Sequence, residues 1–173
     1  SQTLEQLDSE ECSKVVIVGP DRADKTSLVF QAAISAAASG IQTVHICTHP
    51  LKRLPILVHG LMTPEPNIMK NLNFLYFEEA GELIAWFAGL HTRTNLPSLI
   101  IIEDILTYAA QLNEQHLDKS LARLCAIIVD GMAWIRSHGD MKICQVLMTA
   151  PARMTSLDSV LSQFDLRCAI YHG

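Results

Sequence analysis

The sequence has few charged residues and no hydrophobic run long enough to cross a membrane. Charged side chains make up 18% of its 173 residues and hydrophobic ones 49%, which excludes an intrinsically disordered chain. A membrane-spanning helix needs about 20 consecutive apolar residues, and the first residues lack the basic stretch followed by an apolar stretch that marks a secretory signal. We therefore expect one globular domain outside the membrane and outside the secretory pathway.

Basic residues are outnumbered and paired cysteine motifs are absent. Thirteen Lys and Arg against eighteen Asp and Glu give a net charge of −5, which counts against a strongly electrostatic nucleic-acid binder but allows a local basic patch. Cys47 and His49 lack the second ligand pair of a zinc site, so we predict that protein ligands alone hold no zinc or other metal ion in this chain. The scattered, odd-numbered cysteines favour reduced core thiols of an intracellular protein: Cys12, Cys47, Cys125, Cys144 and Cys168.

Short apolar strands alternate with helical segments along the chain. Strands are predicted at residues 14–19, 42–47, 72–77, 98–102, 142–148 and 166–171, and helices at 25–39, 80–90 and 117–137. Apolar strands separated by helices are typical of a parallel sheet covered on both faces, so the predicted fold class is three-layer α/β. Residues 1–13 are predicted to form an acidic N-terminal tail or short helix. Residues 48–70 contain four prolines and are predicted as loop, with at most a short helix near 54–61.

The first predicted strand leads into a segment with the spacing of a phosphate-binding loop. Gly19-Pro-Asp-Arg-Ala-Asp-Lys25-Thr26 matches G-x-x-x-x-G-K-[ST] except at Asp24, in the strand–loop–helix setting that the motif requires. In such loops backbone N–H groups surround the phosphates, the lysine reaches the outer phosphates and the hydroxyl binds Mg²⁺. Asp24 replaces the second glycine and adds a charge that repels phosphate. The same residues also fit the start of an ordinary surface helix.

An acid follows another apolar strand, as a magnesium site beside a phosphate loop would require. Leu99-Ile-Ile-Ile102 is followed by Glu103, with Asp104 as a competing choice. In phosphate-loop proteins a carboxylate at the end of a buried strand helps to hold the metal. A solvated strand end is the alternative for this acid taken alone, and the phosphate loop at residues 19–26 favours the magnesium role.

The order of these segments resembles the ATPase core of RecA-type recombinases. The resemblance is carried by the phosphate loop, the strand Leu72-Asn-Phe-Leu-Tyr-Phe77, the segment Ser98-Leu-Ile-Ile-Ile-Glu-Asp-Ile105, the long helix, and the strands ending in Val146-Leu-Met-Thr149 and Leu166-Arg-Cys-Ala-Ile-Tyr171. It implies a three-layer RecA-like P-loop ATPase core with a mostly parallel central sheet over residues 14–173. Because the chain stops at Gly173 directly after a strand, we expect it to be truncated at its C-terminus.

The degenerate loop, the Pro97-Ser-Leu-Ile-Ile-Ile-Glu segment and the small size are most similar to the recombinase paralogue that associates with a SWIM-domain zinc protein in the metazoan Shu complex. The resemblance implies a nuclear homologous-recombination mediator subunit. With its SWIM-domain partner, in a heterodimer or higher assembly, it would bind single-stranded DNA and support assembly or stability of the recombinase filament. ATP and Mg²⁺ are the implied cofactors.

By the family pattern, phosphate and magnesium would be contacted by Gly19, Lys25 and Thr26, with Glu103 as the magnesium-side acid. Three departures from that pattern bear on hydrolysis. Thr48-His49-Pro50 stands where recombinases place a catalytic glutamate, Thr149-Ala150-Pro151 stands where they place a polar sensor, and Asp24 alters the loop. We therefore expect weak DNA-dependent or partner-dependent ATPase activity, or none.

Contacts to DNA and to partner proteins are less marked in the sequence. The candidate DNA-binding residues are Lys52, Arg53 and Arg153, with Arg93 as a further basic residue, and each also fits a solvated surface charge. Trp86, Phe87 and the Trp134 of the long helix fit either a core or a protein interface. The run Phe30-Gln-Ala-Ala33 resembles the Phe-x-x-Ala polymerisation motif of recombinases, but inside a helix it is more simply core.

The alternative function is that of an independent small P-loop kinase or NTPase. Asp24, the lack of an arginine-rich lid and the lack of an Asn-Lys-x-Asp motif count against it. An independent enzyme is expected to turn over as a soluble monomer, whereas an obligate subunit is expected to be unstable without its partner.

Overall fold

The computed structural model describes residues 13–21, 23–50 and 66–172, which form an α/β fold. Within them, six strands make one all-parallel sheet in the order β3-β2-β4-β5-β1-β6. The strands are β1 (Lys14–Gly19), β2 (Thr43–Cys47), β3 (Leu72–Tyr76), β4 (Leu99–Ile102), β5 (Gln145–Pro151) and β6 (Arg167–Ile170). The predicted α/β class with a parallel central sheet is confirmed, and the arrangement is consistent with a RecA-like core.

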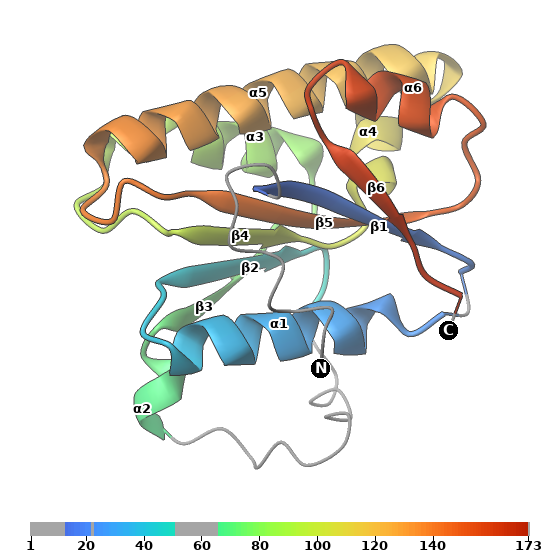
Figure 1. The fold of residues 1–173 in the computed structure, drawn as a ribbon. Helices are drawn as coiled ribbons and strands as arrows, with labels where there is room; N and C mark the ends of the chain where they lie inside the picture. Colours follow the sequence, from blue (N-terminus) through green and yellow to red (C-terminus); the bar gives the residue numbers. More distant parts are fainter. Residues whose placement is uncertain (1–12, 22, 51–65, 173) are drawn as a thin grey trace.

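Helices cover both faces of the sheet and complete three layers (Figure 1). On one side lie α1 (Lys25–Ala38) and α2 (Pro66–Met69), and on the other lie α3 (Ala80–Ala88), α4 (Ile105–Asn113), α5 (Leu117–His138) and α6 (Leu157–Ser162). Two 3₁₀ turns, η3 (Leu90–Thr92) and η4 (Glu114–His116), follow α3 and α4. Among the helices in the described ranges, none combines the length and the apolar character needed to cross a membrane.

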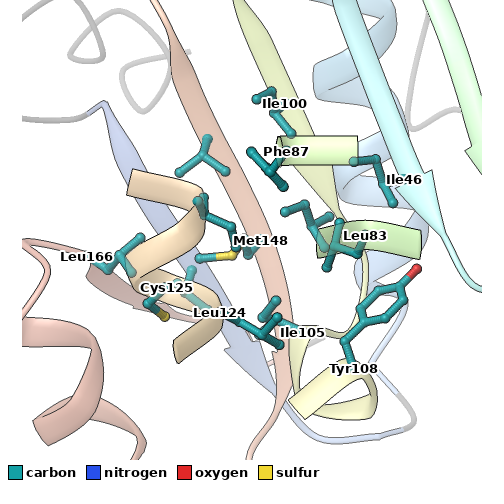
Figure 2. Close-up of a cluster of buried hydrophobic side chains, with 14 of the residues drawn as sticks. Ile46, Leu83, Phe87, Ile100, Ile105, Tyr108, Leu124, Cys125, Met148 and Leu166 are labelled. Carbon is teal, nitrogen blue, oxygen red and sulfur yellow. The ribbon is translucent and has the colours of Figure 1, made fainter. Parts of the chain in front are cut away.

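Strand β4 shows how the sheet is buried from both sides. Ile100 and Ile102 belong to the large apolar cluster with α3, α4, α5 and α6, whereas Leu99 and Ile101 belong to the smaller cluster with α1. Figure 2 shows part of the large cluster, where Ile100 lies close to Phe87 of α3. Alternate side chains of one strand thus anchor it to both helix layers. This packing fixes the position of the backbone from which the residues after the carboxyl end of β4 continue.

Three helices and the extent of one strand differ most from the sequence prediction. Helices α2, α4 and α6 were not predicted, because four, nine and six residues are too few to show a sustained helical period. The strand predicted at 142–148 instead runs from Gln145 to Pro151, so Thr149-Ala150-Pro151 are strand residues. Lys142 has a φ of +53°, which is incompatible with extended backbone. The helix expected near 54–61 and residues 1–12 lie outside the described residues.

Burial separates core side chains from surface ones among the residues left open by the sequence. Trp86 and Phe87 are buried in the large cluster and meet edge to face with ring centroids 4.9 Å apart, so they are core residues. Phe30 and Ala33 are buried in the α1 cluster, which confirms their interpretation as core. Trp134 is 37% exposed on α5 and stacks on the ring of a neighbouring histidine.

The four cysteines in the described residues carry free thiols, and Cys47, Cys125 and Cys144 are buried. Burial raises the pKa of Cys125 and of Cys144 to about 12. Burial, and then the charge of Glu103, raise the pKa of Cys47 to about 11. These three thiols remain protonated near neutral pH, which suits the predicted packing role and makes them poor nucleophiles. Cys12 lies outside the described residues.

Candidate phosphate-binding and magnesium-binding site

The candidate site lies at the carboxyl ends of β1, β4 and β5, where β1 passes into α1 (Figure 1). Ligands of open parallel sheets bind at this edge. Gly19 ends β1 and is closely surrounded, because a Cβ atom there would be 2.6 Å from the carbonyl oxygen of Tyr171. The amide of Ala152 donates to the Gly19 carbonyl at 3.1 Å. The loop therefore begins from a backbone clamped by the segments after β5 and β6.

Lys25, the first residue of α1, turns its side chain back over the loop. Its ammonium group donates to the carbonyl oxygen of Pro20 at 2.6 Å and to that of Gly19 at 3.2 Å. The Lys25 ammonium group that a phosphate would bind is thus hydrogen-bonded to carbonyl oxygens of the loop. Because these bonds are partly exposed, anionic oxygens entering the loop can replace them.

Asp24 acts as the N-cap of α1. Its carboxylate accepts hydrogen bonds from the backbone amide of Ser27 at 3.0 Å and from the Ser27 hydroxyl. These two bonds, the hydroxyl one first, lower the pKa of Asp24 below its usual value of 3.8. Its φ is −75°, so the chain takes this turn without the left-handed conformation for which the motif uses glycine. Asp24 thus carries no strain from a left-handed backbone, and its negative charge at the helix N-terminus remains.

A chain of hydrogen bonds joins α1, β4 and β2. The hydroxyl of Thr26 donates to Glu103 Oε2 at 2.7 Å, and His45 Nε2 lies 2.6 Å from Glu103 Oε1. The backbone amide of Glu103 also donates to the Ile46 carbonyl at 2.9 Å. The fold thereby brings together the threonine and the acid that the sequence assigned to magnesium, although 77 positions separate them.

Asp104, the competing acid, has a different structural task. Its carboxylate accepts hydrogen bonds from the amide and the hydroxyl of Thr107, at the start of α4. The residue has a φ of +50°, and its own amide donates to Thr149 Oγ1 at 2.9 Å. Asp104 lines the same cleft as Glu103, but only Glu103 is hydrogen-bonded to Thr26.

These residues line an open cleft of about 540 Å³. Its lining includes four carboxylates and two cations: Asp21, Asp24, Glu103 and Asp104 with Lys25 and Arg153. Arg153 comes from the segment after β5, and its Nε and Nη2 atoms each lie 3.0 Å from Asp21 Oδ1. The predicted DNA contact Arg153 therefore lies at the mouth of the phosphate-loop cleft.

The other predicted site residues lie elsewhere or outside the described ranges. Lys52 and Arg53 fall in the undescribed segment 51–65. Arg93 precedes β4, at the opposite edge of the sheet from Arg153, and its guanidinium lies 5.3 Å from the Trp86 ring centroid. His49 is exposed. Arg93 and Arg153, two basic residues considered for DNA binding, therefore do not lie on one continuous surface.

Sequence reasoning missed two residues that shape the site, His45 and Asp21. The strand prediction for residues 42–47 gives His45 no role, although its ring stands between two apolar neighbours in the sequence. The loop motif leaves the position of Asp21 unspecified, and its pairing with Arg153 cannot be read from residues 132 positions apart. In the described part of the chain, no group of three or more His, Cys, Asp or Glu side chains is placed to hold a metal ion.

The chain is similar in sequence to a known protein. No protein-family model matches the chain. Over 129 residues, 72% of this chain, the sequence is 31% identical to a mouse protein named ATPase SWSAP1. The matched region is 43% of that relative's length, so the chain spans less than half of the protein that it resembles. The match is in accord with the resemblance to RecA-type recombinase paralogues and does not single out one subunit.

Proposed function

We propose that this chain is the nucleotide-binding core of a homologous-recombination mediator subunit, with the cleft beside Gly19, Lys25 and Thr26 as its site for ATP and Mg²⁺. The observation that carries the proposal is the Thr26–Glu103 hydrogen bond, which joins the phosphate loop to the acid after β4. A threonine hydroxyl and a carboxylate provide the oxygen ligands that suit Mg²⁺. Similarity to a protein named ATPase SWSAP1 supports the same assignment.

In this proposal the chain's own groups act mainly by binding. Backbone amides at the start of α1 face the phosphates, Lys25 leaves the carbonyls of Gly19 and Pro20 for phosphate oxygens, and Thr26 with Glu103 would hold the metal. The metal ion neutralises phosphate charge when it is bound. Because the cleft has four carboxylates and two cations, binding of a triphosphate is expected to depend strongly on Mg²⁺.

Turnover is expected to be slow. Where recombinases place a catalytic glutamate this chain has the exposed His49, and Thr149, at the expected sensor position, is buried and accepts a hydrogen bond from Asp104. The proposed activity is therefore nucleotide-dependent assembly with weak ATPase activity stimulated by DNA or a partner. The proposed partners are a SWIM-domain zinc protein, the recombinase and single-stranded DNA in the nucleus, with Arg153, Lys52 and Arg53 as DNA contacts.

Equilibrium titration with a fluorescent ATP analogue tests this proposal. Wild type is compared with Lys25→Ala and with Lys119→Ala, a matched control that removes an exposed lysine from α5 on the other side of the sheet. Each protein is titrated with and without Mg²⁺, alone and co-expressed with the SWIM-domain partner. Saturable binding that needs Mg²⁺ and is lost only in Lys25→Ala is the expected result.

Three other results would overturn the proposal in whole or in part. Binding that is equal in wild type and Lys25→Ala would show that the loop is not the nucleotide site. Rapid turnover by a monomer without DNA or partner would favour the alternative, an independent P-loop kinase or NTPase. Absence of binding in every state would leave the fold as a scaffold for protein and DNA contacts and remove the nucleotide from the proposal.

A further inference from the structure

A fully buried histidine lies directly beneath the proposed magnesium-side acid. His45 is in the middle of β2 with 0% of its surface exposed, and its Nε2 atom is 2.6 Å from Glu103 Oε1. Its Nδ1 atom is buried and has no hydrogen-bond partner among the described residues. A polar ring that leaves one nitrogen unsatisfied is an unfavourable choice for a core, so its contact with Glu103 calls for a reason.

Both oxygens of Glu103 are held by donors from different elements. A carboxylate has no proton to give, so the Nε2–H of His45 donates to Oε1, while the Thr26 hydroxyl donates to Oε2. The His45 ring is itself held against Phe74, with centroids 5.3 Å apart and an interplanar angle of 29°. A donor fixed in a strand thus sets the rotation of the Glu103 carboxylate, and Oε2 is left facing Thr26.

The identity of the acid explains why such a donor is useful. The metal-side acid of P-loop NTPases is described as aspartate, and glutamate has one more rotatable bond. Glu103 is also partly accessible, with 15% of its side chain exposed, so packing alone does not fix it. The hydrogen bond from His45 supplies the restraint on the Glu103 carboxylate that packing does not.

We propose that His45 is a positioning residue for magnesium, which orients Glu103 so that its carboxylate and Thr26 would hold the ion together. This inference rests on the proposed nucleotide site and adds a residue to it. Hydrogen-bond partners of metal-binding groups tune metal affinity in this way, and their loss typically weakens metal binding roughly 10-fold to 100-fold.

The test compares His45→Phe, which keeps a ring against Phe74 but donates no hydrogen bond, with His45→Gln, which can still donate to Glu103. Folding is checked by far-UV circular dichroism, and binding of the fluorescent ATP analogue is measured against Mg²⁺ concentration and in EDTA. His45→Phe should raise the Mg²⁺ concentration for half-maximal binding about 10-fold or more. Its residual affinity in EDTA should match that of wild type, and His45→Gln should recover most of the Mg²⁺ response.

A purely structural role for His45 would change both conditions alike or neither. Unaltered Mg²⁺ dependence in a folded His45→Phe protein, or equal defects in the Phe and Gln variants, would overturn the inference and leave the nucleotide site standing. Absence of Mg²⁺-dependent binding in wild type would overturn both. If His45→Phe does not fold, His45→Met serves as the variant without a donor. In a Glu103→Gln background, loss of the His45 donor should add little further Mg²⁺ defect.

Discussion

Arg153 and Asp21 form an ion pair across the mouth of the cleft, linking the segment after β5 to the phosphate loop. The Arg153 Nε atom lies 3.0 Å from Asp21 Oδ1 and 3.1 Å from Asp21 Oδ2. Both side chains are more than half exposed, at 69% and 55%. Exposed pairs of this kind contribute little to stability because solvent screens them, so an incoming anion can take Arg153 from Asp21 at little cost.

Removing the Asp21 charge should therefore tighten nucleotide binding. Asp21→Asn takes one carboxylate from the cleft and frees Arg153 for a phosphate oxygen. Affinity for the Mg²⁺ complex of the ATP analogue should rise by a factor of up to about 5. Fluorescence titration measures it, and the gain should vanish when Arg153 is also changed to Ala. A gain that persists in the double variant would show that Asp21 acts by charge alone.

The proposed DNA role of Arg153 gives a second prediction. Arg153→Glu should weaken binding of the chain and its partner to single-stranded DNA and should flatten the salt dependence, because fewer counterions are released. Fluorescence anisotropy with a labelled oligonucleotide at several salt concentrations measures both. Arg123→Glu, on the exposed side of α5, is the charge-matched control. Equal behaviour of the two variants would remove Arg153 from the DNA interface.

Asp24 should trade helix stability against phosphate binding. Asp24→Ala removes the cap of α1 and should lower the free energy of unfolding by about 0.5–2 kcal/mol, whereas Asp24→Ser keeps a capping oxygen without charge. Both should bind the nucleotide more tightly than wild type. Denaturant unfolding followed by circular dichroism measures the first effect and analogue titration the second. A weaker affinity in Asp24→Ser would contradict the electrostatic argument.

The pH dependence of the Asp24 cap has a definite sign. Because the pKa of Asp24 is lowered in the folded protein, its stabilising effect is present above the usual value of 3.8 and is lost as pH falls through the folded value. In acid, wild type should therefore lose free energy of unfolding relative to Asp24→Ser. Near neutral pH the difference between the two proteins should stay constant. The same unfolding curves, recorded across this range, test it.

Local patterns were sufficient to predict the strands of the sheet and to select the candidate loop residues. Four apolar residues before Glu103 predict a buried strand, because such a run can be covered on both faces. The N-cap role of Asp24 was also predictable, since aspartate before a helical segment is a known start signal. The comparison with the loop motif treated this position only as a replaced glycine. The signal for α4 was weaker, because its nine residues show little more than two helical turns.

Long-range contacts account for what could not be predicted. The hydrogen bond between His45 and Glu103 joins residues 58 positions apart, and it depends on β2 being the neighbour of β4 in the sheet. No local pattern in the sequence specifies that neighbour, because the order of the strands in the sheet differs from their order along the chain. For example, β1, the first strand, lies between β5 and β6. The site was therefore predictable as a set of residues and unpredictable as a network.

Gly19 should be required for the packing of the last strand. A Cβ atom at Gly19 would lie 2.6 Å from the backbone carbonyl of Tyr171, which cannot move without shifting the end of β6. Gly19→Ala should lower the free energy of unfolding by more than about 1 kcal/mol, as overpacking in cores does, and should weaken nucleotide binding. Gly81→Ala is the control, because its Cβ meets no atom within 4 Å and alanine favours the helix. Equal stability of the two variants would contradict this packing.

The two tryptophans should respond in opposite ways to truncation. Trp86 is 6% exposed, meets Phe87 edge to face and carries Arg93 over its ring, so Trp86→Ala should cost about 3–5 kcal/mol of unfolding free energy. Trp134 is 37% exposed and its ring stacks on that of His138 on the same helix, so Trp134→Ala should cost no more than about 1 kcal/mol. Chemical denaturation followed by circular dichroism distinguishes them. A large loss in Trp134→Ala would mean that the outer face of α5 contributes to the core, whereas a small loss in Trp86→Ala would contradict the position of α3 against the sheet.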